Sequence, residues 1–204
     1  PVDYQYDIPA GYIRRSALNN DVPGLQYGLA RQGEGPCAIL VSDSKYGYRA
    51  AKRQLGLTLI NRSTSPDPYP ERGIHSITLW LGACGPDAKE AEQMATACNH
   101  GLFYQPSNSH PGTLPMESSL LGAKTESGVI SAVLPGEDGK ILVRAYGTAA
   151  EKEEIALRFA SDVAEAKAVN LFGKEQGAGV KVSGNQLTFQ VEPYALAEVE
   201  VELA

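Results

Sequence analysis

The stretch GVISAVLPGEDGKILVRAYG, from Gly128 to Gly147, decides the fold class of this chain. Two apolar runs of strand length flank the tetrapeptide Gly-Glu-Asp-Gly. Glycine and aspartate favour the backbone angles of tight turns, whereas Val, Ile, Leu and Tyr favour strands. The stretch therefore predicts two β-strands joined by a turn.

Further runs of the same kind follow this pair toward the C-terminus. Each is short, and turn residues such as the Ser-Gly-Asn at 183–185 separate them. They are EIALRFA at 154–160, KAVNLF at 167–172, GVKVSG at 179–184 and QLTFQV at 186–191. Short strands at this spacing are typical of a β-sandwich.

The first half of the chain also alternates apolar and polar residues, as in LGLTLINRS at 55–63 and IHSITLWLG at 74–82. In the second of these, alternation places Ile77, Leu79 and Leu81 on one face of a strand and Trp80 on the opposite face. An aromatic side chain in a strand is explained by packing between two β-layers. We favour this interpretation of Trp80 over stacking on a sugar ring.

One segment has a helical pattern instead. In DAKEAEQMATACNHG, small and apolar residues recur at helical intervals between Asp87, a start signal, and Gly101, a stop signal. We therefore predict one short amphipathic helix over residues 87–99. The proline-rich and polar segment that follows, up to about residue 120, cannot sustain a helix or a strand ladder. The sequence thus predicts a large β-sandwich portion at 1–125, which includes the helix, and a small β-sandwich at 126–204.

Composition and charge narrow the class of protein. The chain has 204 residues, of which 43% are apolar, and a formal net charge of −6. A nucleic-acid ligand needs a concentrated basic surface, and a membrane span needs about 20 consecutive apolar residues, so neither partner is predicted. The acidic runs EKEE at 151–154 and EVEVEL at 198–203 are interpreted as solvated charge. Three cysteines without a paired spacing, Cys37, Cys84 and Cys98, indicate free thiols and a cytoplasmic protein.

Catalytic and metal-binding motifs are scarce. No GxSxG nucleophile elbow occurs, and no local acidic pair is distinctive enough for glycoside hydrolysis. His100 and His110 flank a loop but lack the spacing of zinc ligands. His75 precedes a strand, where a hydrogen-bonded histidine that fixes a loop is the favoured interpretation. We expect no catalytic residue and no metal site within these residues.

The stretch VSDSKYGY, from Val41 to Tyr48, has two interpretations that the residues alone leave open. As a turn, it has Asp43 and Ser44 bonding their own backbone, Gly47 at positive φ, and Tyr46 and Tyr48 on one side. As a site, it projects Asp43, Lys45 and a tyrosine hydroxyl into a cleft, where they suit a polyhydroxylated ligand.

Taken in order, the segments resemble the C-terminal β-sandwich portion of glycoside hydrolase family 38, the α-mannosidases. The resemblance rests on YDIPAGYIRRS, DVPGLQYG, AILVSDSKYGY and LGLTLINRSTSPDPYPERGIHSITLWL, and later on ATACNHGL, SGVISAVLPGEDGKILVRAYG and VEPYALAEVEVEL. It spans nearly the whole chain. Three positions depart from the family pattern: Leu134-Pro135, Gly147 and Cys84.

The resemblance implies an all-β fold, in which part of a supersandwich of the galactose-mutarotase-like type precedes a smaller β-sandwich. It also implies retaining hydrolysis of α-mannosides, with a zinc ion, by an upstream catalytic domain, so these residues alone are expected to be inactive. The partners it implies are that domain and the α-mannoside. It places Asp43, Lys45, Tyr46 and Tyr48, with the proline-spaced loop at 61–73, near the wall of the sugar pocket.

Two rival functions stay open. One is an autonomous carbohydrate-binding module, suggested by the aromatic and polar loops. The other is a purely structural or oligomerisation β-sandwich, in which VSDSKYGY is architecture alone. If the first sandwich is incomplete, an open sheet edge with exposed apolar residues predicts a homo-oligomer.

Overall fold

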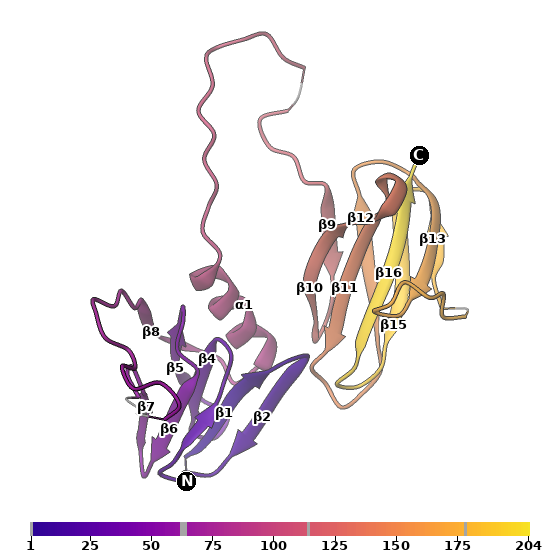
Figure 1. Cartoon of the computed structure of the whole chain (residues 1–204). Helices are drawn as coiled ribbons and strands as arrows, with labels where there is room; N and C mark the ends of the chain where they lie inside the picture. Colours follow the sequence, from indigo (N-terminus) through magenta and orange to yellow (C-terminus); the bar gives the residue numbers. More distant parts are fainter. Residues whose placement is uncertain (1, 62–64, 114, 178) are drawn as a thin grey trace. The chain divides into compact units, whose positions relative to one another are not determined.

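The computed structural model describes residues 2–61, 65–113, 115–177 and 179–204. The chain forms two compact units, Pro1–Phe103 and Tyr104–Ala204, each with its own core (Figure 1). Over these described residues the fold is mostly β with one α-helix, as the sequence predicts. Among the described residues, no helix has the length and apolar character to cross a membrane. The predicted domain limits at residue 125 stay a prediction; the first strand of unit 2, β9, begins at Leu121.

Unit 1 contains two antiparallel sheets. The first, sheet A, has five strands in the order β2-β1-β4-β5-β8, and the second, sheet B, has three in the order β3-β6-β7. The strands of sheet A are β1 (Asp3–Ile8), β2 (Gly11–Arg15), β4 (Tyr27–Arg31), β5 (Cys37–Ser42) and β8 (Leu79–Cys84). Those of sheet B are β3 (Asp21–Pro23), β6 (Gly47–Ala51) and β7 (Gln54–Leu57).

Each face of sheet A has its own apolar cluster. Tyr4 and Tyr6 of β1 pack against Tyr48 and Ala50 of β6, which fills the space between the two sheets. On the other face, residues of β4, β5 and β8 pack against Ala91 and Ala95 of the helix α1. The alternation of side chains along each strand explains how one sheet supports both clusters.

Helix α1 (Ala88–Asn99) confirms the predicted helix. The side chain of Asp87 accepts a hydrogen bond from the backbone N–H of Lys89 at 2.9 Å, which is the expected N-cap. Ala91 and Ala95 are four residues apart, so they share the face that is buried against sheet A. The helix ends at Asn99, and the N–H of His100 donates to the carbonyl of Thr96.

The predicted alternation along β8 is confirmed, but Trp80 packs between sheet A and the helix rather than between two β-layers. Trp80 packs against the α1-side cluster, whereas Leu79 is 40% exposed and Leu81 is 81% exposed. The period of two was predicted correctly, but it does not tell which face meets the core. The strand β8 is the last in sheet A, and only its α1 side is covered within the described part of unit 1.

Unit 2 is the predicted β-sandwich. One sheet has the order β10-β11-β16-β13 and the other β14-β15-β12-β9, and their facing side chains form a single core cluster. The strands are β9 (Leu121–Lys124), β10 (Gly128–Pro135), β11 (Ile141–Gly147), β12 (Glu153–Phe159), β13 (Val163–Val169), β14 (Lys181–Ser183), β15 (Gln186–Val191) and β16 (Leu196–Leu203).

The Gly-Glu-Asp-Gly turn at 136–139 lies between β10 and β11. Gly136 donates its N–H to the carbonyl of Lys140, and Asp138 and Gly139 have φ values of 53° and 79°. These left-handed angles are the reason for the Asp-Gly pair. The predicted strand at 167–172 differs, because β13 ends at Val169 and the Asn170 side chain accepts the N–H groups of Phe172 and Lys174 in a turn.

Candidate functional site

The turn Ser42–Tyr46 carries the chain from sheet A to sheet B. The hydroxyl of Ser42 accepts the backbone N–H of Lys45 at 2.9 Å and that of Ser44 at 3.3 Å. The local bonds predicted for Asp43 and Ser44 are therefore made by Ser42. The predicted positive φ of Gly47 is also wrong, since this glycine is an ordinary first residue of β6.

Asp43 ties the turn to the residue just before β8. Its carboxylate accepts the backbone N–H of Thr78 at 3.0 Å, and its own N–H donates to the carbonyl of Thr78. The Ser44 hydroxyl also donates to it at 2.7 Å, and this bond holds the pKa of Asp43 below its usual value. A carboxylate that stays ionised can accept hydrogen bonds from a ligand but is unsuited to act as a general acid.

Lys45 connects the turn to the proline-spaced loop. Its Nζ lies 3.7 Å from Oε1 of Glu71, and Oε2 of Glu71 accepts the backbone N–H of Asn61. His75 forms a ring-nitrogen hydrogen bond with the carbonyl of Glu71 at 2.9 Å, which confirms its predicted role in fixing the loop. The two segments that sequence analysis placed near a sugar pocket are thus neighbours. Residues 62–64 of the loop lie outside the described residues.

The two tyrosines of the stretch do not lie on one side. Tyr46 is 59% exposed, because it precedes β6 and belongs to the turn. Tyr48 is 0% exposed and packs on Tyr6, with ring centroids 6.1 Å apart. Burial raises the pKa of the Tyr48 hydroxyl, which donates to the carbonyl of Gln26 at 2.8 Å. Tyr48 therefore lies in the core, apart from the other three candidates, and it could touch a ligand only if unit 1 opened.

A buried hydrogen-bond network below the turn is centred on Gln26. Its carbonyl accepts the N–H of Ser42 at 2.9 Å as well as the Tyr48 hydroxyl. Its own N–H donates at 2.7 Å to the carboxylate of Asp7, which also accepts the N–H groups of Leu25 and Tyr27. The position of the turn relative to sheet A thus depends on Asp7.

The exposed part of this region is polar and aromatic. Asp43, Lys45 and Tyr46 form the turn, and in the neighbouring loop Arg72 stacks on the exposed ring of Tyr69 at 4.5 Å. An ammonium and phenol hydroxyls can donate to sugar oxygens, and a tyrosine face can pack on a pyranose ring. It stays a prediction that the wall of a sugar pocket is formed by Asp43, Lys45, Tyr46 and Tyr48.

The other histidines and the cysteines make local contacts. Ring nitrogens of His100 and His110 form hydrogen bonds with nearby backbone carbonyls. Cys37 and Cys84 are free, buried and directly opposite each other in the register of β5 and β8, a pairing that their sequence separation hid. Burial raises the pKa of both thiols, that of Cys84 to about 11.

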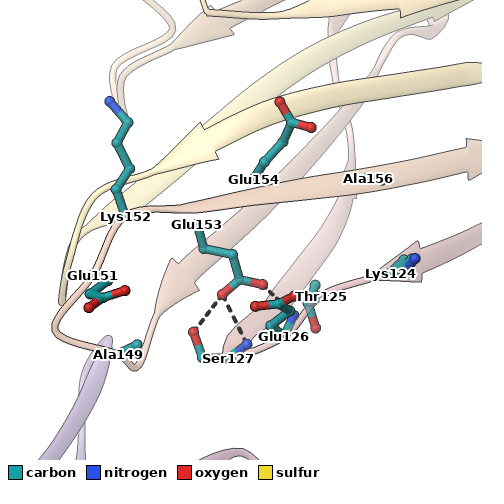
Figure 2. Close-up of a pocket in the computed structure, with 10 residues that line it drawn as sticks. All are labelled: Lys124, Thr125, Glu126, Ser127, Ala149, Glu151, Lys152, Glu153, Glu154 and Ala156. Carbon is teal, nitrogen blue, oxygen red and sulfur yellow. Dashed lines mark hydrogen bonds between the residues drawn. The ribbon is translucent and has the colours of Figure 1, made fainter.

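Unit 2 has a polar pocket of about 540 Å³ beside the loop between β9 and β10 and the start of β12 (Figure 2). Glu153, at 9% exposure, is the most buried acidic group there. Its carboxylate accepts the backbone N–H groups of Glu126 and Ser127 and the Ser127 hydroxyl (Figure 2). Burial alone would raise the pKa of Glu153, but these hydrogen bonds outweigh it and leave the pKa below the ordinary value.

Sequence analysis missed Glu153, because the run EKEE was interpreted as solvated charge. A signal was present: Glu153, Ile155, Leu157 and Phe159 share the period of two that places a strand's core face. The hydrogen bonds of Glu153 fix the loop rather than leave a reactive group free. Among the described residues, no three His, Cys, Asp or Glu side chains gather as a metal site would require.

Comparison with known proteins identifies unit 2. Residues 128–197 match the family model described as the glycosyl hydrolases family 38 C-terminal beta sandwich domain. No curated protein matches the chain. The matched residues run from the first residue of β10 into β16, so they cover most of the β-sandwich of unit 2. The β-sandwich of unit 2 therefore matches the C-terminal β-sandwich domain of glycosyl hydrolase family 38 over residues 128–197.

Proposed function

We propose that this chain is a non-catalytic part of an α-mannosidase, which packs on the catalytic domain and lends the turn Asp43–Tyr46 to the wall of the sugar pocket. The family 38 match of residues 128–197 carries the proposal. A C-terminal domain of this family is attached to an upstream catalytic domain of a glycoside hydrolase. Retaining hydrolysis of α-mannosides is the activity that we assign to the joined polypeptide.

The geometry of unit 1 supports a wall role for the turn. Lys45 forms an ion pair with Glu71 at 3.7 Å and the Asp43 carboxylate accepts the N–H of Thr78, so both side chains have partners that restrict them before a ligand binds. Ordered donors lose less conformational entropy on binding than free ones. Tyr46 adds an exposed ring and hydroxyl at the same turn.

Two further elements belong to the proposal. The zinc ion that the family resemblance implies is assigned to the upstream domain. Among the residues described for this chain, no group of His, Cys, Asp or Glu side chains is suited to bind the metal, and no step of the reaction is assigned to the zinc ion.

A cytoplasmic location is supported by the three free cysteines.

Hydrolysis of 4-nitrophenyl α-mannoside tests the proposal. We expect the 204-residue chain alone to show no hydrolysis above the buffer rate, and the longer family 38 polypeptide that contains it to release α-mannose with retained configuration. Proton NMR of the first-formed product measures the configuration. Hydrolysis by the 204-residue chain, or an inverted product from the longer polypeptide, would contradict the proposal.

Titration with mannose and mannobiose separates this function from that of a carbohydrate-binding module. A wall is only one side of a pocket, so we expect no binding to the isolated chain at millimolar sugar. Calorimetry of the 204-residue chain makes the measurement. Millimolar or tighter binding would favour the autonomous module.

A further inference from the structure

Two cysteine side chains face each other on sheet A. Cys37, the first residue of β5, and Cys84, the last residue of β8, are directly opposite in the antiparallel register of these strands. Opposite residues point to the same face of a sheet, and both cysteines belong to the apolar cluster on the α1 side of sheet A. All three cysteines of the chain are free thiols, so this pair is reduced in the structure.

The register sets the distance between these two cysteines. Opposite residues of an antiparallel pair have Cα atoms about 4.5 Å apart at a non-hydrogen-bonded position and about 5.5 Å apart at a hydrogen-bonded one. Disulfides join cysteines whose Cα atoms are about 4.4–6.8 Å apart. Both kinds of position lie within this range, and the pairing of β5 with β8 has no register shift that would displace one cysteine. The backbone therefore already holds the pair at the Cα separation of a disulfide.

The third cysteine is less well placed for a bridge. Cys98 lies in the last turn of α1 and packs against the same apolar cluster. Its backbone belongs to the helix layer, whereas Cys37 and Cys84 are on neighbouring strands of one sheet. Of the three possible pairs, Cys37 and Cys84 form the one that strand pairing aligns.

We propose that Cys37 and Cys84 are an oxidisable thiol pair, which hydrogen peroxide converts into a disulfide that locks β8 to β5. The thiolate of one cysteine breaks the O–O bond of the peroxide and becomes a sulfenic acid, and the other peroxide oxygen leaves as water. The second sulfur then displaces the hydroxyl group of the sulfenic acid as water and forms the S–S bond. The two thiols lose two electrons and two protons, and one hydrogen peroxide is reduced to two water molecules.

Burial makes this oxidation slow. Both side chains are buried, and burial raises the pKa of both thiols, although the charge of Arg31 opposes the increase at Cys37. The thiolate is the reactive form, so little of it is present near neutral pH. Each cysteine lies at the end of its strand, and β8 is the last strand of sheet A, so local opening of this end gives the peroxide access. The pair therefore stays reduced in a reducing compartment and forms its bond under sustained exposure to oxidant.

The disulfide also restrains the strands that carry the turn Ser42–Tyr46. The cysteines lie at one end of the β5–β8 pair, and at the other end Asp43 bonds to Thr78. The bridge closes the chain between residues 37 and 84 into a loop that contains β6 and β7. A cross-link across a long loop lowers the entropy of the unfolded chain. We therefore expect oxidation to stabilise unit 1.

Thiol counting after treatment with hydrogen peroxide tests the inference. In the folded 204-residue chain, we expect the thiols that react with Ellman's reagent in urea to fall from three to one, and peptide mass spectrometry to find the bridge between Cys37 and Cys84. Dithiothreitol should restore all three thiols. In the matched variant Cys98→Ala, the count should fall from two to zero without a dimer on a non-reducing gel. The same treatment of the unmodified chain in urea is the control, where the unfolded chain should give all three pairings.

Three thiols that survive the treatment of the folded chain, or a bridge that includes Cys98, would overturn the inference. Urea unfolding followed by Trp80 fluorescence tests the lock, because Trp80 lies on β8. Oxidised Cys98→Ala protein should unfold at a higher urea concentration than its reduced form, and an equal or lower concentration would overturn the lock. These results are independent of α-mannoside hydrolysis, so a failure of this inference is distinguished from a failure of the proposed function.

Discussion

Replacing Asp7 by alanine is expected to lower the free energy of unfolding of unit 1 by about 3–5 kcal/mol. Asp7 is 2% exposed, and its carboxylate accepts the backbone N–H groups of Leu25, Gln26 and Tyr27 at 2.7–3.0 Å. Alanine removes the acceptor of the Gln26 and Tyr27 N–H groups, and each unsatisfied buried donor costs about 1–3 kcal/mol, whereas the Leu25 N–H keeps a 3.3 Å hydrogen bond to the carbonyl of residue 7. The turn Ser42–Tyr46 should loosen as well, because Gln26 holds Ser42 and Tyr48.

The single tryptophan makes this effect measurable in unit 1 alone. Trp80 packs against the α1-side cluster, so its fluorescence reports the urea unfolding of that unit. Asp3→Ala, at the exposed start of the same strand, is the control and should change the free energy by less than about 0.5 kcal/mol. A loss below about 1 kcal/mol for Asp7→Ala would show that the loop 25–27 finds other acceptors.

Glu153→Gln is expected to destabilise unit 2 by about 1–3 kcal/mol, because hydrogen bonds to a charged acceptor are stronger than those to a neutral amide. The amide offers one acceptor oxygen where the carboxylate offers two, so at least one of the donors from Glu126 and Ser127 loses its partner. Far-UV circular dichroism follows unfolding of the whole β structure, and Trp80 fluorescence identifies the part that belongs to unit 1.

Glu154, the next residue in the strand, is exposed and serves as a matched control. Its carboxylate lies 3.9 Å from the Lys181 Nζ at the surface. Glu154→Gln should change the stability by less than about 0.5 kcal/mol. An equal effect of the two substitutions would contradict the role of Glu153 in fixing the loop between β9 and β10.

These two buried carboxylates should give opposite pH dependences. Burial raises the pKa of Asp7 above its ordinary 3.8 despite the N–H bonds that lower it, so the folded protein holds this proton more tightly than the unfolded chain, and the free energy of unfolding falls as pH rises through the folded pKa. The pKa of Glu153 lies below its ordinary 4.5, so its contribution is present above that value and is lost as pH falls through the folded pKa. Stability curves of Asp7→Ala and Glu153→Gln, relative to the unmodified chain, should therefore slope in opposite directions with pH.

The sequence predicts the element types of this fold well, because its local signals agree with the tertiary structure. The Gly-Glu-Asp-Gly turn forms where Asp138 and Gly139 need positive φ, and α1 begins after its Asp87 cap. Where a strand ends is less certain. The predicted strand at 167–172 is longer than the observed one. Strand β13 ends at Val169, because the Asn170 side chain competes for backbone N–H groups.

Which side of a strand packs against the core is harder to predict than the alternation of its side chains. Trp80 and Leu81 alternate as expected, but which of them meets the core depends on α1 and on how far sheet B extends. The candidate site shows the same limit. Tyr46 and Tyr48 are separated by two positions, yet the turn ends between them, so one is exposed and the other is buried. Glu153 was not predicted as a buried residue, because its charge indicated exposure. Its alternation with Ile155 and Leu157 indicated the core face of the strand.

The most direct test of the central claim is kcat/KM for α-mannoside hydrolysis by the longer polypeptide that the proposed function requires, carrying Lys45→Ala. Arg49→Ala is the control, since Arg49 forms a similar exposed ion pair with Asp21, 2.8 Å away on the neighbouring strand. If the turn Asp43–Tyr46 is a wall of the sugar pocket, Lys45→Ala should lower kcat/KM at least tenfold, about 1.4 kcal/mol of transition-state stabilisation, while Arg49→Ala changes it little. Unchanged kcat/KM for Lys45→Ala, with a lowered Tm, would contradict the claim and leave the turn as architecture.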